Sequence, residues 1–372
     1  MSDQTSPAAS AAPQSFPCNS CGARVEFAPG TNTLQCPYCG HQQTIQATGA
    51  RIREHSFDGL MAKPRRSPEQ MGAYRLVCQQ CGAHTESSAL SQKCQFCAAP
   101  LVADTSVDHQ IAPEAVLPFA LDRSAARTAL RGWVKSRWFA PNRLKKVTEA
   151  ESTKSTYVPH WTYDANTTSN YHGERGDYYY VTETYTVTVN GKSETRTRQV
   201  RKIRWRPAAG TVNRFFDDVL VIGSRYVTHE QLSELEPWPL NHAQPYQPTY
   251  LAGHHTLRYD VEPEAGLEVA KAKMAQVIDG DCRRDIGGDQ QRVHSVNTAH
   301  ANITYKLMLL PVWICCYLFG GKNWQVLING QTGEVQGARP YSVAKIAAAV
   351  TAGLLVVALI VFLFIINGDS GA

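Results

Sequence analysis

A long apolar run without charged residues lies near the C-terminal end of this chain. Residues 346–366 contain no charged side chain, and a helix of that length, at about 1.5 Å per residue, matches the roughly 30 Å hydrocarbon core of a bilayer. A helix of this length on the surface of a soluble protein would carry a polar face, and this segment has none. The pattern therefore predicts one transmembrane helix at 346–366, followed by a short tail at 367–372.

The charges beside this segment predict its orientation. Arg339 and Lys345 precede the span, and no Lys or Arg follows it. Because positive residues are retained in the cytoplasm, we expect a single-pass protein of the inner (cytoplasmic) membrane, with its bulk in the cytoplasm and its short tail outside. Residues 1–15 are rich in Ser, Ala, Gln and Pro and lack the apolar run of a signal peptide, which predicts a disordered N-terminus.

Two segments in the middle of the chain have the apolar spacing of helices, with steps of three to five residues. The first contains Ala126, Leu130, Trp133, Val134 and Trp138, and the second contains Leu267, Ala270, Met274, Val277 and Ile278. Each precedes a strand-like apolar run with a Pro-x-Trp core, at 159–161 and 311–313. We expect an α+β domain at 110–340, built from two related helix-plus-antiparallel-sheet units. Coincidence is the alternative, because Pro-x-Trp is a short motif.

A polar β-hairpin is predicted between the two units, as an insertion at 170–206. Residues 178–189 alternate Tyr, Thr and Val, Asn190-Gly191 fits a two-residue turn, and 192–206 return, so that residue i should oppose residue 381 − i. This register sets Glu183 opposite Arg198 and Asp177 opposite Arg204, which favours a solvated, partly ion-paired surface. One face of the returning strand carries Arg196, Arg198, Lys202, Arg204 and Arg206. Nucleic acid or anionic lipid is the alternative ligand of these cations.

Eight of the eleven cysteines form four Cys-x-x-Cys pairs, which group into two sets of four. The sets are Cys18, Cys21, Cys36 and Cys39, and Cys78, Cys81, Cys94 and Cys97. Two thiolates on each tight turn, with two turns facing one another, make a tetrahedral cage that suits Zn²⁺. Glycine follows the second cysteine of three pairs, where the turn needs a left-handed residue, whereas Ala98 follows the fourth. Iron in place of zinc is the alternative.

These spacings predict two N-terminal Cys₄ zinc ribbons that bind two Zn²⁺ ions. Ribbon 1 is expected at 16–46 and ribbon 2 at 75–103, joined by a linker at 47–74. Disulfides would require an oxidising compartment, to which no N-terminal signal directs the chain.

The sequence offers no catalytic constellation. It contains no Gly-rich phosphate loop and no Gly-x-Ser-x-Gly, and its histidines lack carboxylates at a useful spacing. A closed Cys₄ site also leaves no open coordination position for a substrate. We therefore expect a protein that is not an enzyme, with no catalytic residues and no cofactor other than zinc. The net charge of +5 argues neither for nor against nucleic acid.

Several motifs in a fixed order suggest a family. Besides the two ribbons and the span, they are Pro-Glu-Ala-Val-Leu-Pro-Phe at 113–119, Tyr-Val-Pro-His-Trp at 157–161, Tyr-Leu-Ala-Gly at 250–253, Leu-Pro-Val-Trp at 310–313 and Asn-Gly-Gln-Thr-Gly at 329–333. This order resembles the YdjG-type bacterial proteins, which are tail-anchored double zinc-ribbon proteins often labelled as primosomal-helicase-like or TFIIB-type zinc ribbon proteins. Ala98 and the long hairpin depart from the pattern.

The resemblance implies a role rather than a reaction. It implies a membrane-anchored adaptor that recruits cytoplasmic partners, SPFH (flotillin-like) or PspA-like proteins, to the inner membrane in envelope stress. The alternative is a membrane-tethered nucleic-acid-binding zinc-ribbon protein of the helicase-associated kind. Partner binding that survives nuclease and moderate salt would distinguish the adaptor, because nucleic-acid binding falls steeply with salt.

Overall fold

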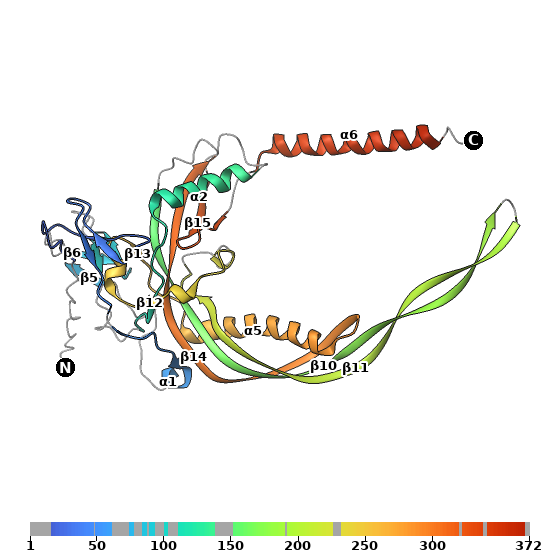
Figure 1. The fold of residues 1–372 in the computed structure, drawn as a ribbon, viewed down its shortest axis with the longest axis horizontal. Helices are drawn as coiled ribbons and strands as arrows, with labels where there is room; N and C mark the ends of the chain where they lie inside the picture. Colours follow the sequence, from blue (N-terminus) through green and yellow to red (C-terminus); the bar gives the residue numbers. More distant parts are fainter. Residues whose placement is uncertain are drawn as a thin grey trace, which may run out of the picture.

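The chain has a mixed α/β architecture that is rich in sheet (Figure 1). The computed structural model describes residues 16–47, 49–61, 74–77, 84–87, 89–93, 100–102, 111–137, 152–189, 192–225, 232–319, 322–337 and 341–368. The helices are α1 (Phe57–Met61), α2 (Arg123–Ser136), α5 (Pro263–Ile286) and α6 (Val343–Gly368), with short 3₁₀ turns η3 (Leu240–His242) and η4 (Pro248–Leu251).

Two long antiparallel strands organise the main sheet. They are β10 (Ser152–Val189) and β14 (Gln290–Phe319), and they pair from Ser152 opposite Cys316 to Gly176 opposite Gln290. The outer edge of β10 pairs with β13 (His255–Thr256) and then with β11 (Lys192–Ile222). The outer edge of β14 pairs with β15 (Lys322–Asn329), β9 (Ala115–Val116) and β4 (His55–Ser56). The result is one long curved sheet, with α5 on its concave side (Figure 1).

Shorter strands complete the fold. β1 (Glu26–Phe27), β2 (Thr33–Gln35) and β3 (Gln42–Thr44) form a separate antiparallel sheet, and β5 (Tyr74–Val77) pairs with β6 (His84–Ser87). β7 (Ser91–Lys93) and β8 (Pro100–Val102) join the main sheet through β13, β12 (Gln244–Pro245) joins through β9, and β16 (Val335–Gly337) pairs with β15.

The two halves of the main sheet are arranged about a local two-fold axis. A shift of 152 residues relates the Pro-x-Trp runs of β10 and β14. Under that shift Leu310 is the equivalent of Val158, and the two residues pair with each other. β9 and β13 pair in parallel with β14 and β10 at equivalent places, and each is followed by a helix, α2 or α5. This is the arrangement that two related helix-plus-sheet units would produce.

Each tryptophan of these motifs binds the segment that enters the other unit's helix. Trp161 on β10 donates its indole N–H to the carbonyl of Val261, at 2.9 Å, two residues before α5 begins. Trp313 on β14 donates to the carbonyl of Leu121, at 3.0 Å, two residues before α2 begins. An aromatic ring packs edge-on against each indole, with centroids at 5.1 and 5.3 Å. The two units therefore hold each other's helices in place.

The predicted hairpin register is correct, but the strands are longer than predicted. Val189 opposes Lys192, Glu183 opposes Arg198 and Asp177 opposes Arg204, and the same register continues to Ala165. The pairing extends beyond 170–206 in both directions, because β14 supports β10 as far as Gly176 and β11 runs on to Ile222. The segment predicted as an insertion is thus the free end of a longer three-stranded sheet.

Beyond Gly176 the hairpin projects as a two-stranded arm, which we define as residues 177–206. The arm extends about 40 Å at ~3.3 Å per residue, and it twists as it leaves the body (Figure 1). It carries seven Lys and Arg and three Asp and Glu, so its net charge of +4 nearly equals the +5 of the whole chain. Two-stranded hairpins without a core are marginally stable in water.

Side-chain pairs along the arm compensate in part for the absent core. Glu183 pairs with both Arg198, at 3.3 Å, and Lys202, at 3.1 Å. Arg201 lies over the ring of Tyr178, with 4.3 Å from its guanidinium carbon to the ring centroid, and two further arginines lie over tyrosines of the same strand. Asp177 lies opposite Arg204 as predicted, but it forms its ion pair with Arg175 of its own strand instead.

Part of the segment predicted as a linker, 47–74, is built into the core. β4 pairs with β14, and Phe57 and Leu60 of α1 are buried against aromatic residues of the main sheet. Glu54 forms an ion pair with Lys306 of β14, and His55 Nε2 lies 2.7 Å from Glu114 Oε1. The described part of this segment, through Met61, therefore fixes the position of the chain that leaves ribbon 1.

Helix α5 lies close against the sheet at Gly266. A Cβ there would lie 2.4 Å from the Tyr163 hydroxyl oxygen, whereas a Cβ at Gly280 on the same helix would meet nothing within 4 Å. We expect Gly266→Ala to destabilise the fold by ~1–3 kcal/mol through overpacking. The matched change Gly280→Ala should be stabilising by ~0.5–1 kcal/mol, because it removes backbone freedom from the unfolded chain. Urea unfolding followed by tryptophan fluorescence measures both, and equal midpoints would contradict the close approach.

Candidate metal centre

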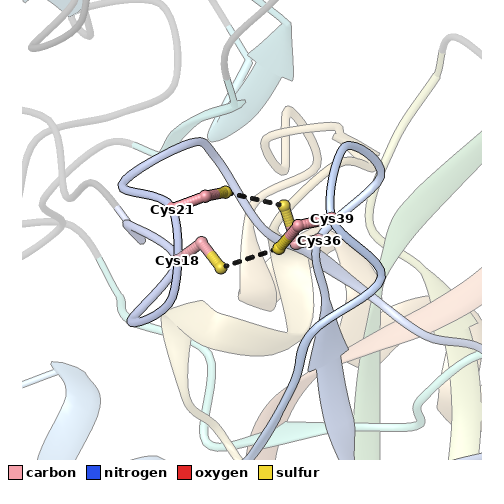
Figure 2. Close-up of side chains that lie close together, drawn as sticks. All are labelled: Cys18, Cys21, Cys36 and Cys39. Carbon is pink, nitrogen blue, oxygen red and sulfur yellow. Dashed lines mark hydrogen bonds between the residues drawn. The ribbon is translucent and has the colours of Figure 1, made fainter.

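Cys18, Cys21, Cys36 and Cys39 come together at the end of the molecule remote from the arm (Figures 1 and 2). Each pair lies on a tight turn closed by the same hydrogen bond: the Gly22 N–H donates to the Cys18 carbonyl, and the Gly40 N–H donates to the Cys36 carbonyl. Both glycines have positive φ, +71° and +73°, as the turn requires. The prediction that these four cysteines form one cluster is therefore confirmed.

The separations of the sulfur atoms fit a tetrahedral metal ion. Cys18 Sγ lies 3.6 Å from Cys39 Sγ, and Cys21 Sγ lies 3.7 Å from Cys36 Sγ. All four sulfurs lie within 4.8 Å of one another (Figure 2). A tetrahedral ion with bonds of about 2.3 Å to sulfur would hold its ligands ~3.8 Å apart. The cluster can therefore hold one metal ion with four thiolate ligands.

The electrostatics of the four thiols favour a cation among them. The backbone N–H groups of Cys39 and Tyr38 lower the pKa of Cys36 to about 7. The N–H of Ala23 favours the Cys21 thiolate, but the neighbouring sulfurs and burial outweigh it and raise the pKa of Cys21 to about 12. Thiolates at these distances repel one another, so a metal ion is needed for all four to be deprotonated at neutral pH.

The cysteine cluster is attached to the main domain rather than held on a free module. Val25, Phe27, Leu34 and Ile45 of ribbon 1 are buried in the same core as Phe119 and residues of α2, β14 and β15. Backbone hydrogen bonds reinforce the contact, from the Phe27 N–H to the Ala252 carbonyl and from the Gly30 N–H to the Phe119 carbonyl. The sequence does not predict this docking, because the ribbon has few apolar residues and they form no periodic pattern.

The residues that flank the four Cys-x-x-Cys pairs are paired with each other at the same offset in every case. In each, the residue before the first cysteine pairs with the residue three after the second cysteine. These flanking pairs are Pro17 with Arg24, Gln35 with Gln42, Val77 with His84, and Lys93 with Pro100. The second predicted ligand set, Cys78, Cys81, Cys94 and Cys97, lies outside the described residues, as does Ala98, so the shared feature is the pairing of the flanking residues alone.

A second group of ligand-type side chains lies within the main sheet. Asp164, Asp217 and Asp218 bring carboxylate oxygens within 4.8 Å of one another. Lys306 forms ion pairs with Asp218 and Glu54 in the same place. Burial would lower the pKa of Lys306, but its hydrogen bonds to Asp218 and Glu54 raise it, so this side chain stays charged. Lys306 therefore supplies the positive charge that these carboxylates need.

The buried histidine His254 is a packing residue. His254 stacks on Phe119, with ring centroids 4.6 Å apart and an interplanar angle of 16°, and Tyr157 meets it edge-on. Burial lowers the pKa of His254 to about 3, so its ring is neutral at physiological pH. Its surroundings are aromatic, which fits a role in the core rather than in proton transfer.

Sequence analysis missed two features near the candidate functional surfaces. The first is the pairing of the residues that flank each Cys-x-x-Cys pair. These residues stand at the same offset from the cysteines in all four cases, but the sequence alone does not show that they pair. The cations of α2 recur every four residues, at Arg123, Arg127, Arg131 and Lys135, and charge patterning along the helix could have found them.

The chain is similar to one curated protein over nearly its whole length. It is 26% identical over 345 residues to the uncharacterized protein YdjG of Bacillus subtilis (strain 168), a match that covers 90% of this chain and 92% of the relative. No protein-family model matches the chain, and no solved structure matches it. The relative is described as uncharacterized, so the likeness identifies a related chain without assigning an activity.

The first cluster makes a direct prediction about metal content. Cys36→Ser should remove one metal equivalent per chain, because three thiolates and a hydroxyl bind zinc far more weakly than four thiolates. The loss should also increase hydrogen exchange around Phe27, whose position depends on the ribbon. Elemental analysis of the purified protein measures the stoichiometry.

Cys282→Ala is the matched control for this experiment. Cys282 is a buried cysteine of α5, remote from the cluster, so its loss should leave the metal content unchanged. Equal metal content in Cys36→Ser and in the unmodified chain would refute the assignment of Cys36 as a ligand.

Proposed function

We propose that this protein is a membrane-anchored zinc-ribbon adaptor that recruits cytoplasmic partner proteins to the inner membrane. The observation that carries the proposal is the exposure of α6. Its segment Ala344–Val361 has a mean hydropathy of 2.4 and none of it is buried in the molecule. Because burying a Val, Leu or Ile side chain is worth about 1.5–3 kcal/mol, an apolar helix of this length is unstable in water. A bilayer provides the missing environment.

The proposed orientation follows from charge and from redox chemistry together. Arg339 and Lys345 precede the helix and favour a cytoplasmic location for the body, with the short tail outside. Cysteines must stay reduced to bind a metal ion, and the cytoplasm is a reducing compartment. These two arguments are independent, and they agree.

We assign zinc to the first cluster and a second zinc to Cys78, Cys81, Cys94 and Cys97. Four thiolates at tetrahedral spacing suit Zn²⁺, which has no geometric preference of its own. The second site is supported by the flanking residues, which pair at the same offset from the cysteines around all four Cys-x-x-Cys pairs.

An adaptor fits these features better than an enzyme. A Cys₄ site is coordinatively closed, so the metal holds structure and does not bind substrate. The turn residues of ribbon 1 are exposed to solvent, and Tyr38 between Cys36 and Cys39 is 64% exposed with Arg24 over its ring. A rigid, exposed aromatic residue is a suitable contact for a protein partner. The partner class is the one that the sequence resemblance implies, SPFH (flotillin-like) or PspA-like proteins.

A membrane-tethered nucleic-acid-binding protein is the second candidate, and the arm favours it. Among the described residues, Arg201, Arg204 and Arg206 have no carboxylate within 4 Å, whereas Arg198 is paired with Glu183. Exposed arginines beside tyrosines can bind phosphates and stack on bases.

Membrane anchoring makes the first prediction of this proposal. Deletion of residues 344–372 should make the chain soluble, because it removes the exposed apolar helix. The full-length protein should remain in the pellet through carbonate washing, and deletion of 367–372 alone should not change that. Recovery of the full-length chain in the soluble fraction would overturn the anchor.

Partner recruitment makes the second prediction. Full-length protein purified in mild detergent, with and without nuclease, should retain an SPFH or PspA-like protein in both halves, as identified by mass spectrometry. Abundant nucleic acid with no stable protein partner would instead favour the second candidate. In that case Arg201→Gln with Arg204→Gln should abolish the bound nucleic acid, because these cations lack acidic partners.

A further inference from the structure

Helix α2 carries a line of four cations at intervals of four residues. Arg123, Arg127, Arg131 and Lys135 follow one another along the flank of the helix, and we call them the α2 cationic stripe. Beside the stripe, Ala126, Leu130 and Val134 are buried in the core. The helix therefore has one apolar stripe that faces the protein and one cationic stripe beside it.

Most of these charges are unfavourable for helix α2 itself. Among the described residues, none of the four cations lies within 4 Å of a carboxylate, and α2 has no acidic residue in its first turn. Like charges at i and i+4 destabilise a helix, and the stripe contains three such pairs. Arg123 also lies at the N-terminal end, where the helix dipole disfavours a cation, and only Lys135 in the last turn benefits from it. An anion from outside the chain would compensate for all of these costs.

The stripe is held close to the start of the span. Leu121 accepts a hydrogen bond from Trp313 of β14, and Leu121 and Ala129 lie against Gly333, just before β16. β16 ends at Gly337 and α6 begins at Val343, so α2 is separated from the span by a short stretch of chain. Figure 1 shows α2 beside the base of α6. Tyr341, 58% exposed at this base, suits the interface between lipid and water.

We propose that the α2 cationic stripe binds the headgroups of anionic phospholipids in the leaflet from which the span emerges. The inference rests on the proposed membrane anchoring. Once the span is inserted in the bilayer, it keeps the stripe close to the headgroups. The local concentration of headgroups around the stripe is then high, so the stripe needs little affinity of its own for lipid. Guanidinium groups bind phosphate oxygens in a bidentate manner, and cations beside a span attract anionic lipid. The arm also has unpaired cations, but its tip lies far from the base of α6 along the curved sheet (Figure 1).

The test uses the full-length chain in a neutral detergent. Native mass spectrometry would count bound molecules of short-chain phosphatidylglycerol and, separately, of phosphatidylcholine. One variant replaces the stripe (Arg123→Gln, Arg127→Gln, Arg131→Gln, Lys135→Gln). The matched control removes four cations from the arm (Lys192→Gln, Arg201→Gln, Arg204→Gln, Arg206→Gln), which changes the net charge equally.

We expect the unmodified chain and the arm variant to prefer phosphatidylglycerol, and the stripe variant to bind it at least ~10-fold more weakly. Equal lipid binding by the two variants, or a loss in the arm variant alone, would overturn the inference. So would displacement of phosphatidylglycerol by a short DNA duplex at equal phosphate concentration, which would identify nucleic acid as the ligand.

A carbonate wash of membranes separates this inference from the anchoring on which it rests. If the stripe is misassigned but the anchor is right, all three proteins stay in the pellet and show the same lipid preference. If the anchor is wrong, the unmodified chain is released from the membrane whatever its lipid preference. Thermal unfolding should show one cooperative transition for each variant, since the replaced side chains lie outside the buried core and both variants should still fold.

Discussion

The pairing of β10 with β14 is the interaction on which the rest of the structure depends. It joins two segments about 150 residues apart in sequence, and it brings each Pro-x-Trp motif to the start of the other unit's helix. Ribbon 1, the 49–61 segment and both sheet-packed helices lie against the surfaces that this pairing creates. Because each unit completes the packing of the other, neither has a full core alone, and the fold is expected to form and unfold as a whole.

Sequence reasoning was most successful where structure is set locally. The Asn-Gly motif predicted the hairpin register correctly as far as Ala165. The Cys-x-x-Cys-Gly pattern predicted the tight turns of ribbon 1 and the first cysteine cluster. The apolar run at 346–366 lies inside α6, and the apolar positions from Leu267 to Ile278 lie inside α5. In each case a few neighbouring residues determine the backbone, and distant contacts have little influence on it.

Features that depend on distant contacts were out of reach. The length of β10 is determined by β14, which pairs with it as far as Gly176, and no local pattern announces that partner. The same holds for β4 and α1, which become ordered against β14 within a stretch predicted as a linker. The docking of ribbon 1 depends on Phe119 and Ala252, which lie far from Phe27 in sequence. A pattern of residues indicates what a segment can form, whereas its partners decide how far it extends.

The outer side of β11 has a consequence for the behaviour of the protein at high concentration. Among the described strands β11 pairs only with β10, so along Lys192–Ile222 one row of backbone groups faces outward. Such a row invites strands from other molecules and is a frequent starting point of aggregation. The repeated cations of this strand repel a second copy, and Pro207 lacks the N–H that a further ladder would need. The same charges that give the arm its basic character thus help keep neighbouring molecules from joining into fibres.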